Sequence, residues 1–187
     1  MYYSSFGILA AILHLIINSN ILFNGIKKNL SGVRAKYNHY LIALLIYYIA
    51  DLMWGVLVET KVRALIYADT WTFFATMALS VLLWTIYVAV FINKKRRRMT
   101  GFIIAGWSIF AFVMIGLIIN FFKPAIFDIT QDAIYVPYFG RYLLLTAQLA
   151  LFAVNSIYSF VASCRYSGRD KTHYLADRKS TRLNSSH

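Results

Sequence analysis

Long apolar stretches alternate with short polar segments along most of the chain. Each stretch holds about 20 residues, which is the length that an α-helix needs to cross a bilayer. The stretches are apolar on every side, whereas the strands of a membrane barrel alternate between apolar and polar positions. The pattern therefore predicts an all-α integral membrane helix bundle with five transmembrane helices. The five predicted spans are residues 5–23, 40–58, 70–92, 101–122 and 141–163.

The composition favours a membrane protein and excludes several other classes. Hydrophobic residues make up 60% of the 187 residues and charged residues only 14%, whereas a soluble domain is about half apolar and about a quarter charged. Aromatic residues make up 17%, which is too many for a disordered chain. Cys164 is the single cysteine, so an intrachain disulfide is excluded, and no Cys/His cluster suggests a metal site. We therefore expect neither a metal nor another cofactor.

The C-terminal segment needs a separate interpretation. Residues 177–187 read DRKSTRLNSSH, which is the translation of a DNA sequence that resembles a common sequencing adapter. Segments of this kind are excluded from fold reasoning. We therefore interpret residues 1–176 as the membrane bundle and residues 177–187 as an artefactual tail, and we expect the natural chain to be interrupted near Ala176.

The distribution of basic residues predicts the orientation of the bundle. Outside the tail, 12 basic residues follow spans one, three and five, while the two alternate loops hold only 4. Basic loops stay in the cytoplasm, so we expect the N-terminus outside and the C-terminal end in the cytoplasm. A basic run between two spans fixes topology and meets anionic lipid headgroups, so we expect the bilayer and not nucleic acid as its partner. The topology anchors are Lys94, Lys95, Arg96, Arg97 and Arg98.

Asp51 is the outstanding polar residue inside a predicted span. A carboxylate at such a depth costs about 2.5–3.5 kcal/mol and usually faces the interior of the bundle. Gln148 and His14 lie at similar depths in other spans, so we expect Asp51 to contact one of them, with Tyr47 and Trp54 on its own helical face. We interpret the group as a ligand contact or polar switch on the outer half of the bundle. The alternative is structural hydrogen bonding between helices, worth about 0.6 kcal/mol on average.

The outer loop, residues 123–140, is rich in aromatic residues and contains both prolines. Asn120 precedes it and Arg141 follows it. An aromatic rim with one arginine suits a small organic or anionic ligand. The loop is therefore predicted to form either a small cap over the bundle or a ligand pocket, with Asn120 and Arg141 as candidate binding residues.

The chain lacks the motifs of common catalytic and nucleotide-binding sites, namely GxSxG, HExxH, the P-loop and GxGxxG. We therefore do not expect this chain to be an enzyme by itself. It also lacks an internal repeat, whereas transporters typically show duplicated halves and broken helices.

Four strings resemble the membrane input region of bacterial signalling proteins, especially those that end in a GGDEF diguanylate cyclase domain or a histidine kinase. The strings are YYIADLMWGVL (47–57), MALSVLLWTIYVAVFI (77–92), LIINFFKPAIFD (117–128) and RYLLLTAQLALF (141–152). The resemblance covers most of residues 2–170 and implies a cytoplasmic output domain after further spans.

These observations lead to two functional hypotheses. The first is a membrane-embedded sensory or anchoring region of a bacterial signalling protein in the plasma membrane, with a small ligand on the outer side and a homodimer as further expectations. The alternative is a fragment of a small-molecule or ion-coupled permease, in which Asp51 would couple to a proton or cation. The reading frame beyond residue 176 separates the two hypotheses, because an output domain would follow in the first and a second set of spans in the second.

Overall fold

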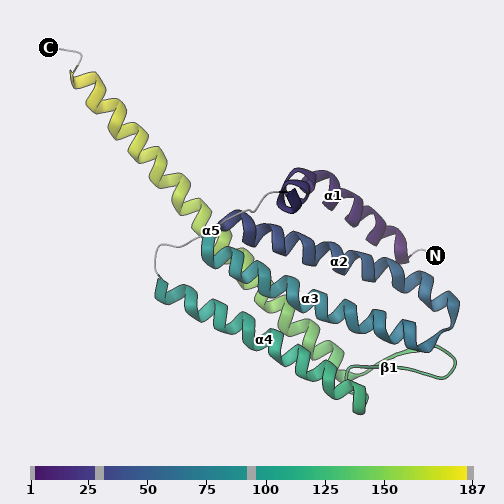
Figure 1. Cartoon of the computed structure of the whole chain (residues 1–187). Coiled ribbons are helices and arrows are strands. Elements are labelled where there is room, and N and C mark those ends of the chain that lie inside the picture. The colour runs from purple at the N-terminus through teal and green to yellow at the C-terminus, as the bar shows by residue number, and fades with distance from the viewer. Residues whose placement is uncertain (1–2, 28–31, 92–95, 185–187) are drawn as a thin grey trace.

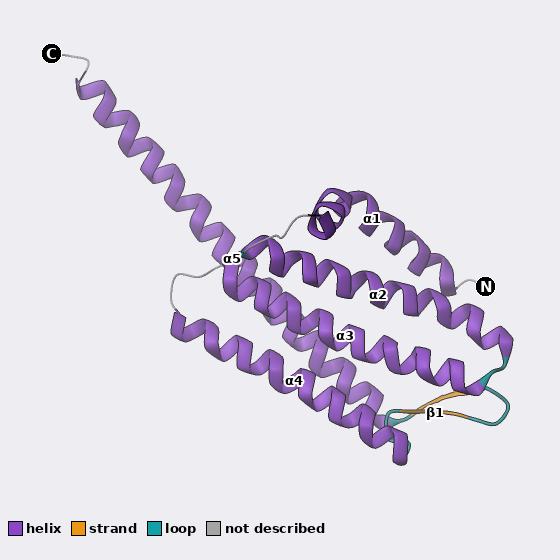
Figure 2. Cartoon of the chain, in the orientation of Figure 1, coloured by secondary structure: helices purple, strands orange, loops and turns teal. Residues whose placement is uncertain are grey.

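The computed structural model confirms the predicted all-α helix bundle (Figures 1 and 2). It describes the backbone of residues 3–27, 32–91 and 96–184, and the side chains within 7–23, 32–91 and 100–161. The helices are α1 (Tyr3–Lys27), α2 (Val33–Thr60), α3 (Arg63–Phe91), α4 (Arg96–Phe122) and α5 (Phe139–Asn184). Two short strands, β1 (Phe127–Ile129) and β2 (Tyr135–Pro137), lie between α4 and α5.

Within the described residues, four helices are long and apolar enough to cross a membrane. They are α2, α3, the part of α4 from Thr100 to Phe122, and the part of α5 from Phe139 to Val161. The apolar part of α1 that can be described, Gly7–Phe23, has 17 residues, which is at the lower limit for a transmembrane helix. The helices thus indicate a multi-pass membrane protein, and the fifth span stays a prediction.

Helix α3 lies at the centre of the bundle. It packs against α2, α4, α5 and β1, whereas α1 packs mainly on α2. In its most apolar stretch, 44% of the residues are buried, against 17% in each of the other three candidate spans. Large apolar side chains on the outer faces of α1, α4 and α5 remain exposed, for example Ile17, Trp107 and Leu149. Such faces suit contact with lipid, because a bilayer does not drive apolar side chains inward as water does.

The helices reach beyond the predicted spans. The predicted fifth span ends at residue 163, and the helix that contains it, α5, continues to Asn184 and extends away from the bundle (Figure 1). It therefore includes residues 177–184 of the segment that resembles an adapter, while residues 185–187 lie outside the described part. Of the predicted topology anchors, Lys94 and Lys95 lie outside the described residues, and Arg96 begins α4.

The strands are a feature that the hydrophobic pattern did not predict. They pair antiparallel, with Phe127 opposite Pro137 and Ile129 opposite Tyr135, and form a hairpin at the end of the bundle where α1 begins (Figure 1). We call this end of the bundle the hairpin end. Ile126, Phe127 and Ile129 are buried in the same apolar cluster as residues of α3, α4 and α5. The outer loop is therefore a cap on the bundle, which was one of its two predicted forms.

Candidate functional site

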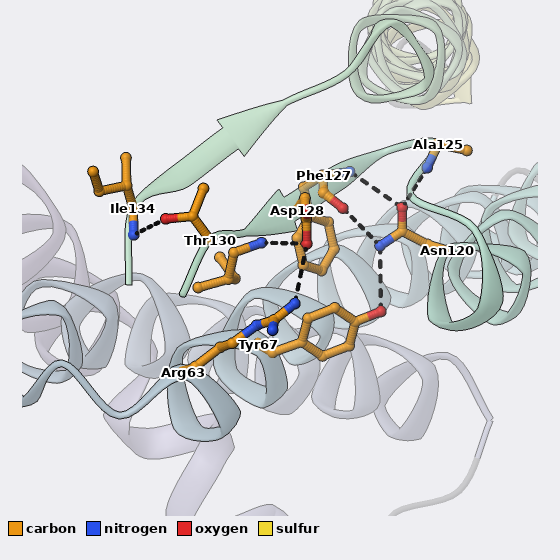
Figure 3. Close-up of polar contacts among 9 residues, drawn as sticks. Arg63, Tyr67, Asn120, Ala125, Phe127, Asp128, Thr130 and Ile134 are labelled. Carbon is orange, nitrogen blue, oxygen red and sulfur yellow. Dashed lines mark hydrogen bonds and ion pairs between the residues drawn. The ribbon is translucent and has the colours of Figure 1, made fainter. Parts of the chain in front are cut away.

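Asn120, at the end of α4, organises the cap. Its Oδ1 accepts hydrogen bonds from the backbone N–H groups of Ala125 (2.8 Å), Ile126 (2.7 Å) and Phe127 (3.2 Å). Its Nδ2 donates to the Phe127 carbonyl oxygen (3.0 Å) and lies 3.3 Å from the Tyr67 hydroxyl oxygen of α3 (Figure 3). Asn120 is buried, and its side-chain amide satisfies the backbone groups of the buried residues Ile126 and Phe127, which would otherwise lack partners. Asn120 is thus bound within the fold and is not available to a ligand.

Further contacts hold the hairpin against the helices. Asp128 of β1 lies 3.6 Å from the Arg63 guanidinium of α3, in a half-exposed ion pair (Figure 3). The turn between the strands is closed by Thr130, whose hydroxyl accepts the Ile134 N–H (Figure 3). At the start of α5, a Cβ on Gly140 would lie 2.4 Å from the Ala125 carbonyl oxygen. Only glycine permits this close approach of the two backbones.

The candidates Trp54 and Arg141 meet at Tyr135 of the hairpin. The Tyr135 ring stacks on Phe127, with ring centroids 6.0 Å apart, and meets the edge of Trp54 at 6.3 Å. The Arg141 guanidinium carbon lies 5.3 Å from the Tyr135 centroid, in a cation–π contact. Burial raises the pKa of Tyr135, while the neighbouring Arg141 partly opposes this shift. These residues connect α2, the hairpin and α5, which gives them a role in holding the cap.

The structure corrects the predicted partners of Asp51. Among the described residues, its carboxylate makes no hydrogen bond or ion pair, so neither His14 nor Gln148 binds it. It lies instead against α1, where a Cβ on Gly7 would be 2.7 Å from Asp51 Oδ2. His14 and Gln148 have similar predicted depths in the membrane to Asp51, but depth does not determine which faces of two helices meet.

His14 is a structural contact between α1 and α2. Its Nε2 lies 3.1 Å from the Leu41 carbonyl oxygen, and its ring meets Tyr48 edge-on at 5.7 Å. Leu41 precedes Asp51 by ten residues, which is about 15 Å along a helix, so His14 cannot reach that carboxylate. One turn further along α1, the Asn18 Oδ1 accepts a hydrogen bond from the Tyr37 hydroxyl (3.1 Å).

Gln148 is one of the residues that line a partly open cavity of about 560 Å³ between α2, α3 and α5. Only 2% of the residue is exposed, yet neither its Nε2 nor its Oε1 has a hydrogen-bond partner. This is unusual because buried polar atoms are nearly always paired. The predicted candidate Tyr47 also lines the cavity. The further lining residues are Tyr40, Leu44, Tyr48, Met77, Ser80, Val81, Leu145, Leu149 and Phe152.

A buried polar contact between α3 and α5 was not predicted from the sequence. Asn155 Nδ2 donates to Thr85 Oγ1 at 2.7 Å, and both residues are fully buried. The Thr85 hydroxyl in turn donates to the Val81 carbonyl oxygen of its own helix (2.8 Å). Asn155 was visible as a polar residue in a span, but no feature of the sequence identified Thr85 as its partner.

The candidate site of this chain is therefore the cavity around Gln148, in which the fold brings Gln148 and Tyr47 together. Asp51 and His14 lie elsewhere, and Asn120, Trp54 and Arg141 belong to the cap. Among the described residues, no group of three His, Cys, Asp or Glu side chains could hold a metal ion. No family model, curated protein or solved structure matches the chain. The fold thus defines a multi-pass membrane helix bundle, and its function must be argued from its own residues.

Proposed function

We propose that this chain is the membrane-embedded sensory region of a bacterial signalling protein, and that the cavity around Gln148 is its ligand site. The observation that carries the proposal is a cavity of about 560 Å³ between α2, α3 and α5, whose lining residues include Gln148, a buried amide without a hydrogen-bond partner. Small-molecule sites typically have volumes of about 300–1,000 Å³, with few polar groups among apolar walls. An unpaired buried amide costs about 1–3 kcal/mol, so the packing of α5 beside the cavity carries an energetic cost.

The position of Gln148 on α5 links the cavity to a signalling output. Helix α5 extends out of the bundle at the end opposite the hairpin (Figure 1). The resemblance of the four strings to signalling proteins supports an output domain on the C-terminal side. A ligand that binds one arrangement of α5 more tightly than another shifts the population towards that arrangement. The proposal therefore assigns α5 as the element that carries the signal.

The coupling can be tested without a known ligand, by filling the cavity. Ser80 of α3 is buried and lines the cavity, so Ser80→Phe puts a ring where a ligand would lie. Spin labels on Cys164 of α5 and on a Gly101→Cys variant of α4 report the distance between the two helices by pulsed electron resonance in lipid nanodiscs. We expect Ser80→Phe to shift the distance distribution. Ala153→Phe, on the exposed face of α5, is the matched control and should leave it unchanged. Equal distributions in both variants would refute the coupling.

The proposal includes an orientation, with the hairpin end outside and the far end of α5 in the cytoplasm. The excess of basic residues in the opposite loops supports it. In a Cys164→Ser background, a single cysteine at Asp132 should react with an impermeant maleimide added to intact cells. A single cysteine at Lys95 should react only after the membrane is opened. The reverse pattern would overturn the orientation.

A second candidate function, ion-coupled transport, is favoured by the carboxylates of α2 and α3. Asp51 of α2 lies against Gly7 of α1, and Asp69 Oδ2 of α3 is buried without a hydrogen-bond partner. Ionisable residues inside membranes often mark ion or proton pathways. In liposomes, a transporter of this kind would move protons, detectable with an enclosed pH-sensitive dye, and Asp51→Asn would abolish the movement. Under the sensory proposal, no proton movement occurs, either in the wild type or in Asp51→Asn.

A further inference from the structure

A second cavity lies at the end of the bundle opposite the hairpin, where α1 ends, α2 begins and α3 ends (Figure 1). It is partly open and has a volume of about 440 Å³. We call it the helix-end cavity. It shares no lining residue with the cavity around Gln148. Its lining residues come from the three helices that meet there: Asn20, Ile21, Val33, Arg34, Tyr37, Tyr87 and Phe91.

Arg34 gives the helix-end cavity a positive charge that no neighbouring group cancels. Among the described residues, it is the only charged residue in the lining, and its side chain makes no ion pair or hydrogen bond. The nearby sequence offers no acidic partner, because residues 20–39 and 87–100 contain no Asp or Glu. Arg34 is also exposed, so its guanidinium group is accessible to an anion. The parallel N–H donors of a guanidinium group match the oxygen atoms of a phosphate group.

The two tyrosines of the lining differ in what they offer to a ligand. The Tyr87 hydroxyl group has no hydrogen-bond partner among the described residues and is not one of their buried polar atoms, so it offers a second accessible donor. The Tyr37 hydroxyl group instead donates to Asn18 Oδ1 at 3.1 Å. The Asn18 amide in turn donates to the His14 carbonyl oxygen at 3.1 Å. These two hydrogen bonds attach the Tyr37 wall of the cavity to α1.

The remaining walls are apolar and continue onto the outer surface of the bundle. The Tyr87 ring packs between those of Tyr37 and Phe91, with centroids 5.0 and 5.8 Å away. Phe91 is 60% exposed and Ile21 is 37% exposed. On a membrane protein, exposed apolar side chains of this kind meet acyl chains, and aromatic residues at helix ends lie at headgroup level. A free phosphate ion would contact only the polar part of this cavity, whereas a phospholipid would also cover its apolar part.

The charge of the cavity restricts the headgroup. A zwitterionic phospholipid carries an ammonium group beside its phosphate group. The described lining contains no carboxylate to pair with that ammonium group, and the Arg34 guanidinium group repels it. A headgroup that joins the phosphate group to an uncharged alcohol avoids this repulsion. The helix-end cavity therefore favours a phospholipid with a net negative charge.

We infer that the helix-end cavity binds the headgroup of an anionic phospholipid of the phosphatidylglycerol class. The phosphate group pairs with the Arg34 guanidinium group, and an acyl chain covers Ile21 and Phe91. This site is more specific than a general attraction of basic loops to the bilayer, because Lys36 carries the same charge two residues along α2 but does not line the cavity. The inference holds whether the bundle senses a ligand or transports an ion.

Native mass spectrometry of the full chain in detergent micelles tests this inference, because it resolves the binding of single lipids. The probes are a phosphatidylglycerol and a phosphatidylcholine with the same acyl chains. We expect the first phosphatidylglycerol to bind about ten-fold more tightly than the first phosphatidylcholine, because its headgroup keeps the charged hydrogen bonds to Arg34 without repulsion. Equal binding of the two lipids would overturn the inference.

Arg34→Gln should reduce this preference to within about three-fold, because a neutral amide replaces the guanidinium group. Lys36→Gln is the matched control, since it removes the same charge from an exposed position of the same helix, and it should keep the preference. Arg34 makes no side-chain hydrogen bond or ion pair with the described residues, so both variants should melt at the temperature of the wild type. The inference fails if Arg34→Gln keeps the preference or if Lys36→Gln loses it equally.

Fluorine NMR of the chain labelled with 3-fluorotyrosine locates the lipid. In nanodiscs, replacing part of the phosphatidylcholine by phosphatidylglycerol should shift the Tyr87 resonance, which is assigned with Tyr87→Phe, and Arg34→Gln should abolish the shift. The resonance of Tyr138, which is exposed at the hairpin end, controls for diffuse surface charge and should not move. An unchanged Tyr87 resonance in the wild type, or equal shifts at Tyr87 and Tyr138, would refute the site.

Glycerol 3-phosphate, which is the phosphate headgroup without acyl chains, separates a lipid from a free phosphate ester. Added to phosphatidylcholine nanodiscs, it should leave the Tyr87 resonance in place, because it cannot cover Ile21 and Phe91. A Tyr87 shift as large as that caused by phosphatidylglycerol would show that the cavity takes a soluble phosphate ester, and would refute the lipid as its ligand.

Discussion

Replacing Asn120 by leucine tests the account of the cap most directly. The change removes the three hydrogen bonds that Oδ1 accepts and the two that Nδ2 donates. Each hydrogen bond contributes about 1 kcal/mol net, and each buried backbone group left unpaired costs about 1–3 kcal/mol. The Ala125 N–H recovers a bond with water because Ala125 is exposed, and the Tyr67 contact is long. We therefore expect Asn120→Leu to destabilise the docked hairpin by about 3 kcal/mol.

This loss should appear as local opening. A change of about 3 kcal/mol raises the population of the open state by about a hundred-fold, and backbone amides exchange with solvent in proportion to that population. Hydrogen exchange followed by mass spectrometry on the peptide covering residues 123–138 should therefore be about a hundred-fold faster in the variant.

Asn155→Leu is the matched control for this prediction. It removes one buried hydrogen bond, to Thr85, between α3 and α5, and such bonds average about 0.6 kcal/mol in membranes. The control should leave exchange in the hairpin within about three-fold of wild type. If Asn120→Leu also stays within that range, the reasoning that assigns the cap to this amide is refuted.

Three further predictions concern stability and ionisation. Gly140→Ala should lower the melting temperature in nanodiscs, because the added Cβ would lie 2.4 Å from a carbonyl oxygen. The control Gly101→Ala has no atom within 4 Å of the added Cβ and should leave the melting temperature unchanged or raise it. Equal changes of the melting temperature in both variants would contradict the close approach at Gly140. Gln148→Leu should raise the melting temperature of the unliganded chain, by about 1 kcal/mol of stability, because it removes an unpaired buried amide; a lower melting temperature would show that the amide has a partner. Burial raises the pKa of Tyr135, and Arg141 partly opposes this shift. Tyrosine-selective carbon NMR should therefore show Tyr135 titrating above the usual pKa of about 10, and its pKa should rise further in Arg141→Gln. Because the folded state then holds its proton more tightly than the unfolded state, stability should fall as the pH rises through this range; titration of Tyr135 at its ordinary pKa would contradict the burial.

The helices were the most predictable part of this fold. Runs of about 20 apolar residues specify membrane-spanning helices by length alone, and four of the five predicted spans coincide with α2 to α5. The central position of α3 is less visible in the sequence. Its buried positions include Thr70, Thr76 and Ser80, whose hydroxyl groups donate to carbonyl oxygens of their own helix. Small side chains that satisfy themselves in this way allow neighbouring helices to approach closely.

The contacts between helices were not predictable, for physical reasons. Gln148 and Asp51 lie at similar depths, but a difference in rotation about the helix axis puts one in the cavity and the other against α1. A hydrophobic pattern with no polar face does not specify that rotation. The hairpin could not be predicted for two other reasons. Its strands have three residues each, which is too short for an alternation of apolar and polar residues to be recognised. Its conformation also depends on hydrogen bonds to Asn120 in the preceding helix.

The hydrogen bond between Asn155 and Thr85 has a mechanical consequence for α5. Gln148 lies seven residues from Asn155 towards the hairpin, and Ala176 lies twenty-one residues away in the other direction. At 1.5 Å per residue, these arms are about 10 Å and about 32 Å long. If α5 tilts as a rigid rod about Asn155, a displacement of about 1 Å beside Gln148 becomes about 3 Å at Ala176. A small tilt of α5 about Asn155 would thus displace the part of the helix beyond the bilayer further than the part within it.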